Sequence, residues 1–126
     1  IDFELVIAAP AEFAPRSELI GGASNIRWES NPLKAAQGAD YVYTDVWVSM
    51  GFEEEKAHRL QVFAPYQINQ AVIREASPTV KLLHCLPAHR GEELSAEVMD
   101  SDCSIVFDEA ENRLHVQKAL LEMLIK

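Results

Sequence analysis

Short apolar segments alternate with segments of helical periodicity along this chain, and this alternation is the feature that most constrains its fold. The expected strands lie at residues 3–8, 26–29, 40–44, 80–85 and 104–107. The expected helices lie at residues 15–20, 32–38, 53–63, 66–76, 92–99 and 109–126. A strand–helix–strand order predicts a parallel sheet with helices on both faces. We therefore expect a single domain over residues 1–126, with an α/β fold of the doubly wound, Rossmann-like type.

Local signals indicate where some of the helices begin. Asn31 precedes Pro32, a pair that is typical of an N-cap followed by the first helical residue. The helix predicted over residues 92–99 has two possible starts, because it is either capped upstream or begins again at Ser95.

Composition excludes several classes of protein. Hydrophobic residues make up 48% of the 126 residues and charged residues 25%, which is ordinary for a globular domain and argues against disorder or a coiled coil. The formal net charge of −9 and the lack of a basic cluster argue against nucleic-acid binding and against anionic membranes. No apolar stretch reaches the roughly 18–20 residues of a membrane span. Two cysteines cannot form a disulfide framework, which favours a cytoplasmic location.

Both ends of the chain look cut. The sequence begins at Ile1 without a methionine, enters an apolar strand at once and stops at Lys126 within a helical pattern. We therefore expect the chain to be a fragment of a longer protein.

The first candidate functional segment follows the third expected strand, where ligands bind in doubly wound sheets. Asp45 can bind an ammonium group, Ser49 can add a hydrogen bond, and Gly51 allows the loop to close over a ligand. The alternative interpretation is structural: Asp45 caps a turn and Trp47 packs in the core.

The second candidate segment is His84-Cys85-Leu86-Pro87, at the end of the most apolar strand. Cys85 is either a nucleophile, a ligand-contacting thiol or a buried structural cysteine. His84 and Cys85 are neighbours in a strand, so their side chains point to opposite faces and a direct catalytic pair is geometrically poor.

Spacing motifs for metals and nucleotides are missing from the sequence. The histidines and cysteines that could bind a metal are His58, His84, Cys85, His89, Cys103 and His115. They show no CxxC, HxxxH or HExxH spacing, so we expect no metal site. GxGxxG and GxxxxGK[ST] do not occur either.

The third candidate segment opens the last expected helix. Arg113 is expected in its first turn, where a guanidinium and free backbone N–H groups can hold an anion such as phosphate. Alternatively, Arg113 pairs with an acidic neighbour. The helix has a wide apolar face, which suggests contact with something beyond one sheet face, such as another domain.

Three motifs occur together in this chain: Asp-Val-Trp-Val-Ser-Met-Gly-Phe-Glu-Glu-Glu at 45–55, His-Cys-Leu-Pro at 84–87 and Ala-Glu-Asn-Arg at 110–113. In this order and spacing the chain resembles the second, ornithine-binding domain of the ornithine carbamoyltransferases. The resemblance implies transfer of a carbamoyl group from carbamoyl phosphate to the neutral δ-amino group of L-ornithine. The products are L-citrulline and phosphate, in arginine biosynthesis or breakdown, and no metal or organic cofactor is needed.

The resemblance also implies roles for individual residues. Asp45 and Ser49 would hold the ornithine α-amino group, and the backbone at Met50 would meet its carboxylate. Cys85 would lie near the δ-amino and carbamoyl groups, with the Leu86 carbonyl accepting from the carbamoyl NH₂. Arg113 would bind and polarise the carbamoyl oxygen.

Parts of the resembled enzyme have no counterpart here. The carbamoyl-phosphate-binding domain is absent, as are the central first strand and the Gly-Asp-Gly-Asn-Asn turn expected before Ile1. Enzymes of this kind are trimers built largely through the absent domain. We therefore expect the chain alone to be inactive.

Other functions stay open. A related carbamoyltransferase could use another amine or an N-acylated ornithine, although Ser49-Met50-Gly51 favours free ornithine. A stand-alone amino-acid-binding module is a second possibility. A cysteine hydrolase using Cys85 is disfavoured because no histidine is placed as its base.

Overall fold

Four short strands form two parallel pairs in the computed structural model, which describes residues 2–49, 51 and 53–125. The strands are β1 (Leu5–Ala8), β2 (Ile26–Glu29), β3 (Tyr41–Thr44) and β4 (Lys81–His84). β1 pairs with β2, and β3 pairs with β4. The predicted α/β fold with parallel strands is confirmed, and these four strands lie where the apolar pattern placed them.

The predicted fifth strand at residues 104–107 is wrong. Ser104 makes only a single parallel bridge with Leu82. Two hydrogen bonds form this bridge, from Leu82 N to Cys103 O at 2.8 Å and from Ile105 N to Leu82 O at 3.0 Å. The chain then enters helix α6 (Val106–Leu124), which begins before the predicted residue 109. Asp108 and Glu109 in its first turn favour a helix start here, because acidic side chains stabilise the positive end of the helix dipole.

The other helices are short, and α2, α4 and α5 start at side-chain caps. They are α1 (Ser17–Ile20), α2 (Pro32–Ala36), α3 (Lys56–Phe63), α4 (Gln70–Glu75) and α5 (Ala96–Met99), with 3₁₀ turns at Ala11–Phe13, Glu53–Glu55 and Ala64–Tyr66. Asn31 caps α2 as predicted, accepting hydrogen bonds from Leu33 N and Lys34 N. Ser95 caps α5, so this helix begins after Ser95, and the predicted helical start at residue 92 is wrong.

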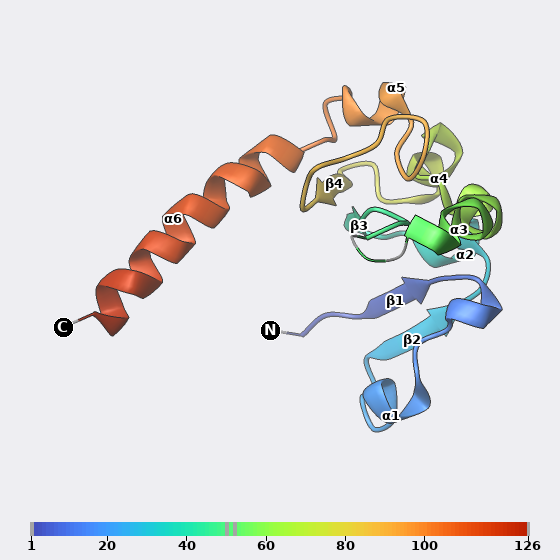
Figure 1. The fold of residues 1–126 in the computed structure, drawn as a ribbon, viewed down its shortest axis with the longest axis horizontal. Coiled ribbons are helices and arrows are strands. Elements are labelled where there is room, and N and C mark those ends of the chain that lie inside the picture. Colours follow the sequence, from blue (N-terminus) through green and yellow to red (C-terminus); the bar gives the residue numbers. More distant parts are fainter. Residues whose placement is uncertain (1, 50, 52, 126) are drawn as a thin grey trace.

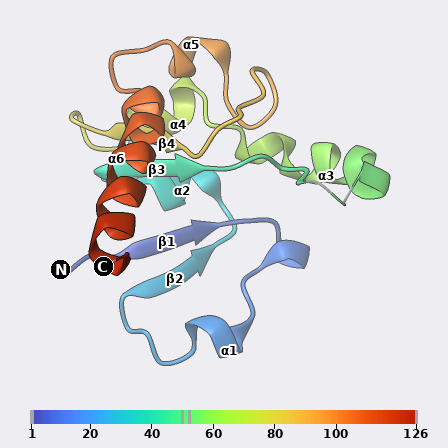
Figure 2. The same cartoon turned by 60° about the vertical axis from the view of Figure 1, so that its left-hand side comes forward.

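The core lies against one face of the β3–β4 pair. Its buried side chains come from β3, β4, α2, α4, α5, the start of α6 and the segments that connect them. They are Ala36, Val42, Ile68, Val72, Val80, Leu82, Leu94, Val98, Met99 and Val106. Helix α2 contacts β1, β2 and α4, so it links the β1–β2 pair to this core. Figures 1 and 2 show the two strand pairs one above the other, with no ladder hydrogen bond between β1 and β3 among the described residues.

Helix α6 extends away from the rest of the chain as an arm (Figure 1). Its first turns contact β4, whereas most of its large apolar side chains are exposed, namely Phe107, Leu114, Val116, Leu120, Leu121, Met123 and Leu124. This agrees with the wide apolar face predicted for the last helix. No helix in the described part of the chain is both long and apolar enough to cross a membrane.

Leu82 offers a test of this core, because its side chain is fully buried in β4. Leu82→Ala should lower the free energy of unfolding by about 2–5 kcal/mol, through lost burial and the cavity left behind. Leu114→Ala, on the exposed arm, should change it by less than about 0.5 kcal/mol. Urea unfolding of the two variants measures the difference, and equal losses would contradict the described core.

Candidate functional site

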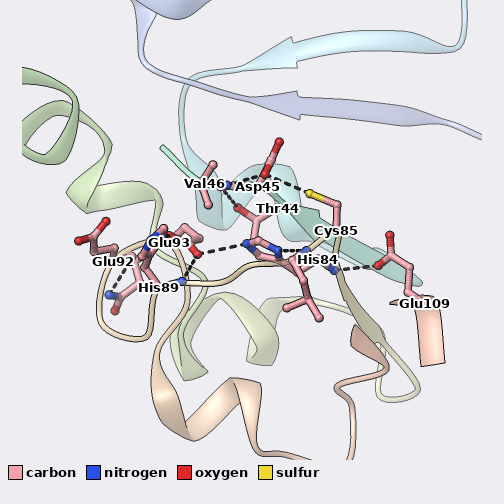
Figure 3. Close-up of polar contacts among 11 residues, drawn as sticks. Thr44, Asp45, Val46, His84, Cys85, His89, Glu92, Glu93 and Glu109 are labelled. Carbon is pink, nitrogen blue, oxygen red and sulfur yellow. Dashed lines mark hydrogen bonds and ion pairs between the residues drawn. The ribbon is translucent and has the colours of Figure 1, made fainter. Parts of the chain in front are cut away.

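The parallel register of β3 and β4 sets two candidate residues side by side. Thr44 is the partner of His84, so the next residue of each strand, Asp45 and Cys85, leaves the sheet at the same edge. The Cys85 thiol donates a hydrogen bond to Asp45 Oδ1 at 3.1 Å (Figure 3). Two residues 40 positions apart in the sequence thus form one polar pair.

Asp45 also has the structural role that the sequence left open. Its Oδ1 accepts a hydrogen bond from Val46 N at 2.7 Å, which fixes the turn after β3. Trp47 is buried and stacks on Phe63 of α3 with ring centroids 6.1 Å apart, so its packing role is confirmed. The Asp45 carboxylate therefore caps the turn. Because Asp45 is also exposed, the carboxylate is still open to a ligand.

The Asp45 carboxylate controls the ionisation of the thiol. It raises the pKa of Cys85, chiefly through the hydrogen bond, and burial raises that pKa further, while the Tyr43 hydroxyl lowers it. The pKa of Tyr43 is itself raised to about 12 by burial and by its interaction with Cys85. Cys85 is therefore held as a neutral thiol near pH 7, a poor state for a covalent nucleophile.

His84 points away from this pair and organises the other side of the strand end. Its buried ring accepts a hydrogen bond from Leu86 N at Nδ1 (2.9 Å), so Nε2 carries the proton and donates to Glu93 Oε1 at 3.1 Å (Figure 3). Leu86 has a φ of 56°, a left-handed conformation that is uncommon for leucine, and the bond to His84 holds it there. Glu109 of α6 accepts from His84 N at 2.9 Å and ties the arm to β4.

A pocket of about 480 Å³ opens beside the Asp45–Cys85 pair. It is lined by Asp45, Val46, Val48, Ser49, Lys56, Leu86, Pro87, His89 and Glu92. Three of the predicted site residues, Asp45, Ser49 and Leu86, thus share one hollow. Met50, the remaining predicted residue of this segment, lies outside the described residues.

Arg113 is not where the sequence predicted it. Because α6 begins at Val106, Arg113 lies beyond the first turn, so the free N–H groups of the helix start do not surround it. Its side chain is exposed and lines a separate hollow of about 320 Å³ with Glu109, Asn112, Val116 and Gln117. The described chain therefore does not bring Arg113 into the pocket of Asp45 and Ser49.

Comparison with known proteins adds independent evidence. Residues 1–124 match the family model described as the aspartate/ornithine carbamoyltransferase, Asp/Orn binding domain. The chain belongs to this family. An ornithine carbamoyltransferase of Chlorobaculum tepidum is 51% identical over 99% of the chain and 38% of its own length. An anabolic ornithine carbamoyltransferase of Pseudomonas aeruginosa is 49% identical over 99% of the chain and 41% of its own length.

Solved structures of the family share the fold. The ornithine carbamoyltransferase of Pyrococcus furiosus superimposes with a TM-score of 0.84 and 42% identity, over 94% of this chain and 41% of that one. An N-acetyl-L-ornithine transcarbamylase is more distant, with a TM-score of 0.80 and 28% identity, over 98% of this chain and 40% of that one. The chain spans about two fifths of the length of these carbamoyltransferases.

Sequence reasoning missed Glu93 and Glu109 in this carbamoyltransferase domain. Glu93 is fully buried and accepts a hydrogen bond from His84, and Glu109 accepts one from the backbone of β4. Neither residue belongs to a spacing motif. The signal that could have found Glu93 is its position in the loop that follows His84, where a buried imidazole needs a partner.

The pair of Asp45 and Cys85 predicts how the thiol responds to mutation. Asp45→Asn weakens the hydrogen bond that chiefly raises the Cys85 pKa and removes the charge that adds to it, so the pKa should fall and alkylation by iodoacetamide at pH 7 should become faster. The rate is measured against pH in a Cys103→Ser background, where Cys85 is the one remaining thiol of the sequence. Asp40→Asn, just before the opposite end of β3, is the control; an unchanged profile in Asp45→Asn would contradict the pairing.

Proposed function

We propose that this chain is the amino-acid-binding part of an ornithine carbamoyltransferase. The enzyme transfers the carbamoyl group of carbamoyl phosphate to the δ-amino group of L-ornithine, giving L-citrulline and phosphate. The observation that carries this proposal is the Asp45–Cys85 pair at 3.1 Å, beside a pocket that also contains Ser49, in a domain of this family. Relatives named ornithine carbamoyltransferase, about half identical over almost the whole chain, support it.

The pocket suits the head group of an amino acid. Asp45 supplies a carboxylate for the α-ammonium group, with Oδ2 left over when Oδ1 accepts from Val46 N and the Cys85 thiol. Ser49 adds a hydroxyl from the same loop. In the proposed complex the backbone at Met50 receives the ornithine carboxylate.

The reacting end of ornithine then lies at the strand end of β4. The δ-amino nitrogen attacks the carbamoyl carbon, the bond from that carbon to the phosphate oxygen breaks, and the nitrogen loses a proton. A neutral Cys85 thiol contacts the amine without forming a covalent intermediate, in agreement with its raised pKa. The Leu86 carbonyl, held by the unusual conformation of that residue, accepts from the carbamoyl NH₂.

Arg113 and the other half of the enzyme complete the site. In the proposed enzyme a carbamoyl-phosphate-binding domain lies against α6 and presents the carbamoyl oxygen to Arg113, which polarises it. The exposed apolar residues of α6 are consistent with such a neighbour. A further strand between β1 and β3, supplied from the preceding sequence, would cover Leu5 and Tyr43, which are 41% and 57% exposed. The assembled enzyme is proposed to be a cytoplasmic homotrimer.

The proposed roles predict a pattern of activity in the full-length enzyme. Asp45→Ala should lower kcat/KM for ornithine by at least about tenfold, since a hydrogen bond to a charged group is worth about 1.5–3 kcal/mol. Cys85→Ala should lower it several-fold, up to about tenfold, since the contact of a neutral thiol is worth about 0.5–1.5 kcal/mol. Cys103→Ala, which lies outside the pocket, should leave kcat/KM within about twofold. Steady-state assay of citrulline measures this, and equal losses in all three variants would contradict the assignment.

The proposed division of the enzyme predicts that the 126-residue chain by itself forms no citrulline from ornithine and carbamoyl phosphate. The full-length enzyme should form citrulline and should prefer ornithine to N-acetyl-L-ornithine. Turnover by the chain alone would contradict the division. Ornithine binding without any turnover by the full-length protein would instead favour an amino-acid-binding module.

A further inference from the structure

The loop after β4 gathers three metal-ligating side chains beside the proposed substrate pocket. The ligand atoms of His89, Glu92 and Glu93 all lie within 4.8 Å of one another. His89 and Glu92 line the pocket, whereas Glu93 is fully buried. Figure 3 shows the three residues close together. The proposed reaction uses none of these three side chains as a substrate contact.

One carboxylate oxygen of Glu93 has hydrogen-bond partners, and the other has none. Oε1 accepts hydrogen bonds from His89 N and from the Nε2–H of His84. Oε2 is buried and has no hydrogen-bond partner. Burying an unpaired carboxylate oxygen is costly, so this atom calls for a proton donor or a cation.

The distance to His89 favours a cation. Glu93 Oε2 lies 3.7 Å from His89 Nδ1, which is too long for a hydrogen bond. Two ligand atoms bound to one zinc ion at about 2.0–2.2 Å in tetrahedral geometry lie about 3.4 Å apart, so only a small rotation of the His89 ring is needed. The His89 side chain is 52% exposed and provides access from solvent.

We propose that His89 Nδ1, a Glu92 carboxylate oxygen and Glu93 Oε2 bind a divalent cation of the zinc class at the rim of the pocket. One imidazole and two carboxylates suit Zn²⁺, and a solvent molecule completes a tetrahedral shell. The hydrogen bonds from His84 and from His89 N orient Glu93 as outer-shell contacts. Spacing motifs did not predict this site, because two of its ligands are glutamates that become ligands only through their position in the fold.

A second cluster, formed by Asp45, His84 and Cys85, is also close enough to hold a cation. Both ring nitrogens of His84 already form hydrogen bonds, because Nδ1 accepts from Leu86 N and Nε2 donates to Glu93. Asp45 Oδ1 is committed in the same way to Val46 N and Cys85. Binding there would break existing hydrogen bonds, so the cluster of His89, Glu92 and Glu93 is the preferred site.

Zinc titration of the full-length protein tests the proposal and does not depend on carbamoyl transfer. ZnCl₂ in competition with a chromophoric chelator should reveal a site whose affinity falls at least about tenfold in His89→Asn and in Glu92→Gln, as expected for the loss of one of three ligands. Glu92→Gln keeps the experiment informative if the buried Glu93 cannot be replaced without unfolding. His115→Asn is the matched control, since His115 and Glu111 form an exposed pair of the same spacing at 3.5 Å.

Cobalt substitution separates the two clusters. Co²⁺ at the proposed site should show no sulfur-to-cobalt charge-transfer band, and Cys85→Ser should leave zinc affinity unchanged. A charge-transfer band together with loss of zinc binding in Cys85→Ser would place the cation at the other cluster and overturn the proposal. Absence of any zinc binding, or equal binding by His89→Asn and the parent protein, would also overturn it.

Discussion

The parallel pairing of β3 with β4 is the constraint on which the rest of this structure depends. Its register sets Thr44 beside His84, and the two residues that follow, Asp45 and Cys85, therefore meet at the carboxyl edge. The side chain of Leu82 in β4 is fully buried in the core and stabilises this pairing. A shift of the β3–β4 register by one residue would turn the Cys85 side chain to the opposite face of the sheet, and Cys85 would no longer meet Asp45.

The side chains of His84 and Cys85, which lie on opposite faces at the end of β4, have different roles. Cys85 contacts Asp45, which lines the pocket and keeps the thiol neutral, so the chemistry offered to a ligand is hydrogen bonding and charge pairing with no thiolate. His84 faces the interior, where it joins the buried Glu93 to the backbone of Leu86. Polar groups held in place in this way lower the cost of positioning a ligand, which suits the proposed binding of an amino acid.

Local patterns predicted much of this fold, since the four strands and the Asn31 cap depend on neighbouring residues. The error at residues 104–107 arose because a short apolar run suits a strand or a buried helix start equally well, and contacts with Leu82 from a distant strand decide between them. The same error placed Arg113 in a first turn. Their positions at strand ends and the motif resemblance both singled out Asp45 and Cys85. The burial of Glu93 depends on its tertiary contact with His84, and its only signal in the sequence is its position in the loop that follows His84.

Ornithine is proposed to bind at the joint carboxyl edge of β3 and β4. Hydrogen–deuterium exchange of the full-length enzyme, with and without L-ornithine in the presence of phosphate, tests it directly. Binding at this edge should slow exchange in peptides covering residues 45–49 and 84–87 and leave exchange across α1 and β2 unchanged. Protection confined to other segments, with residues 45–49 and 84–87 unaffected by saturating ornithine, would contradict it.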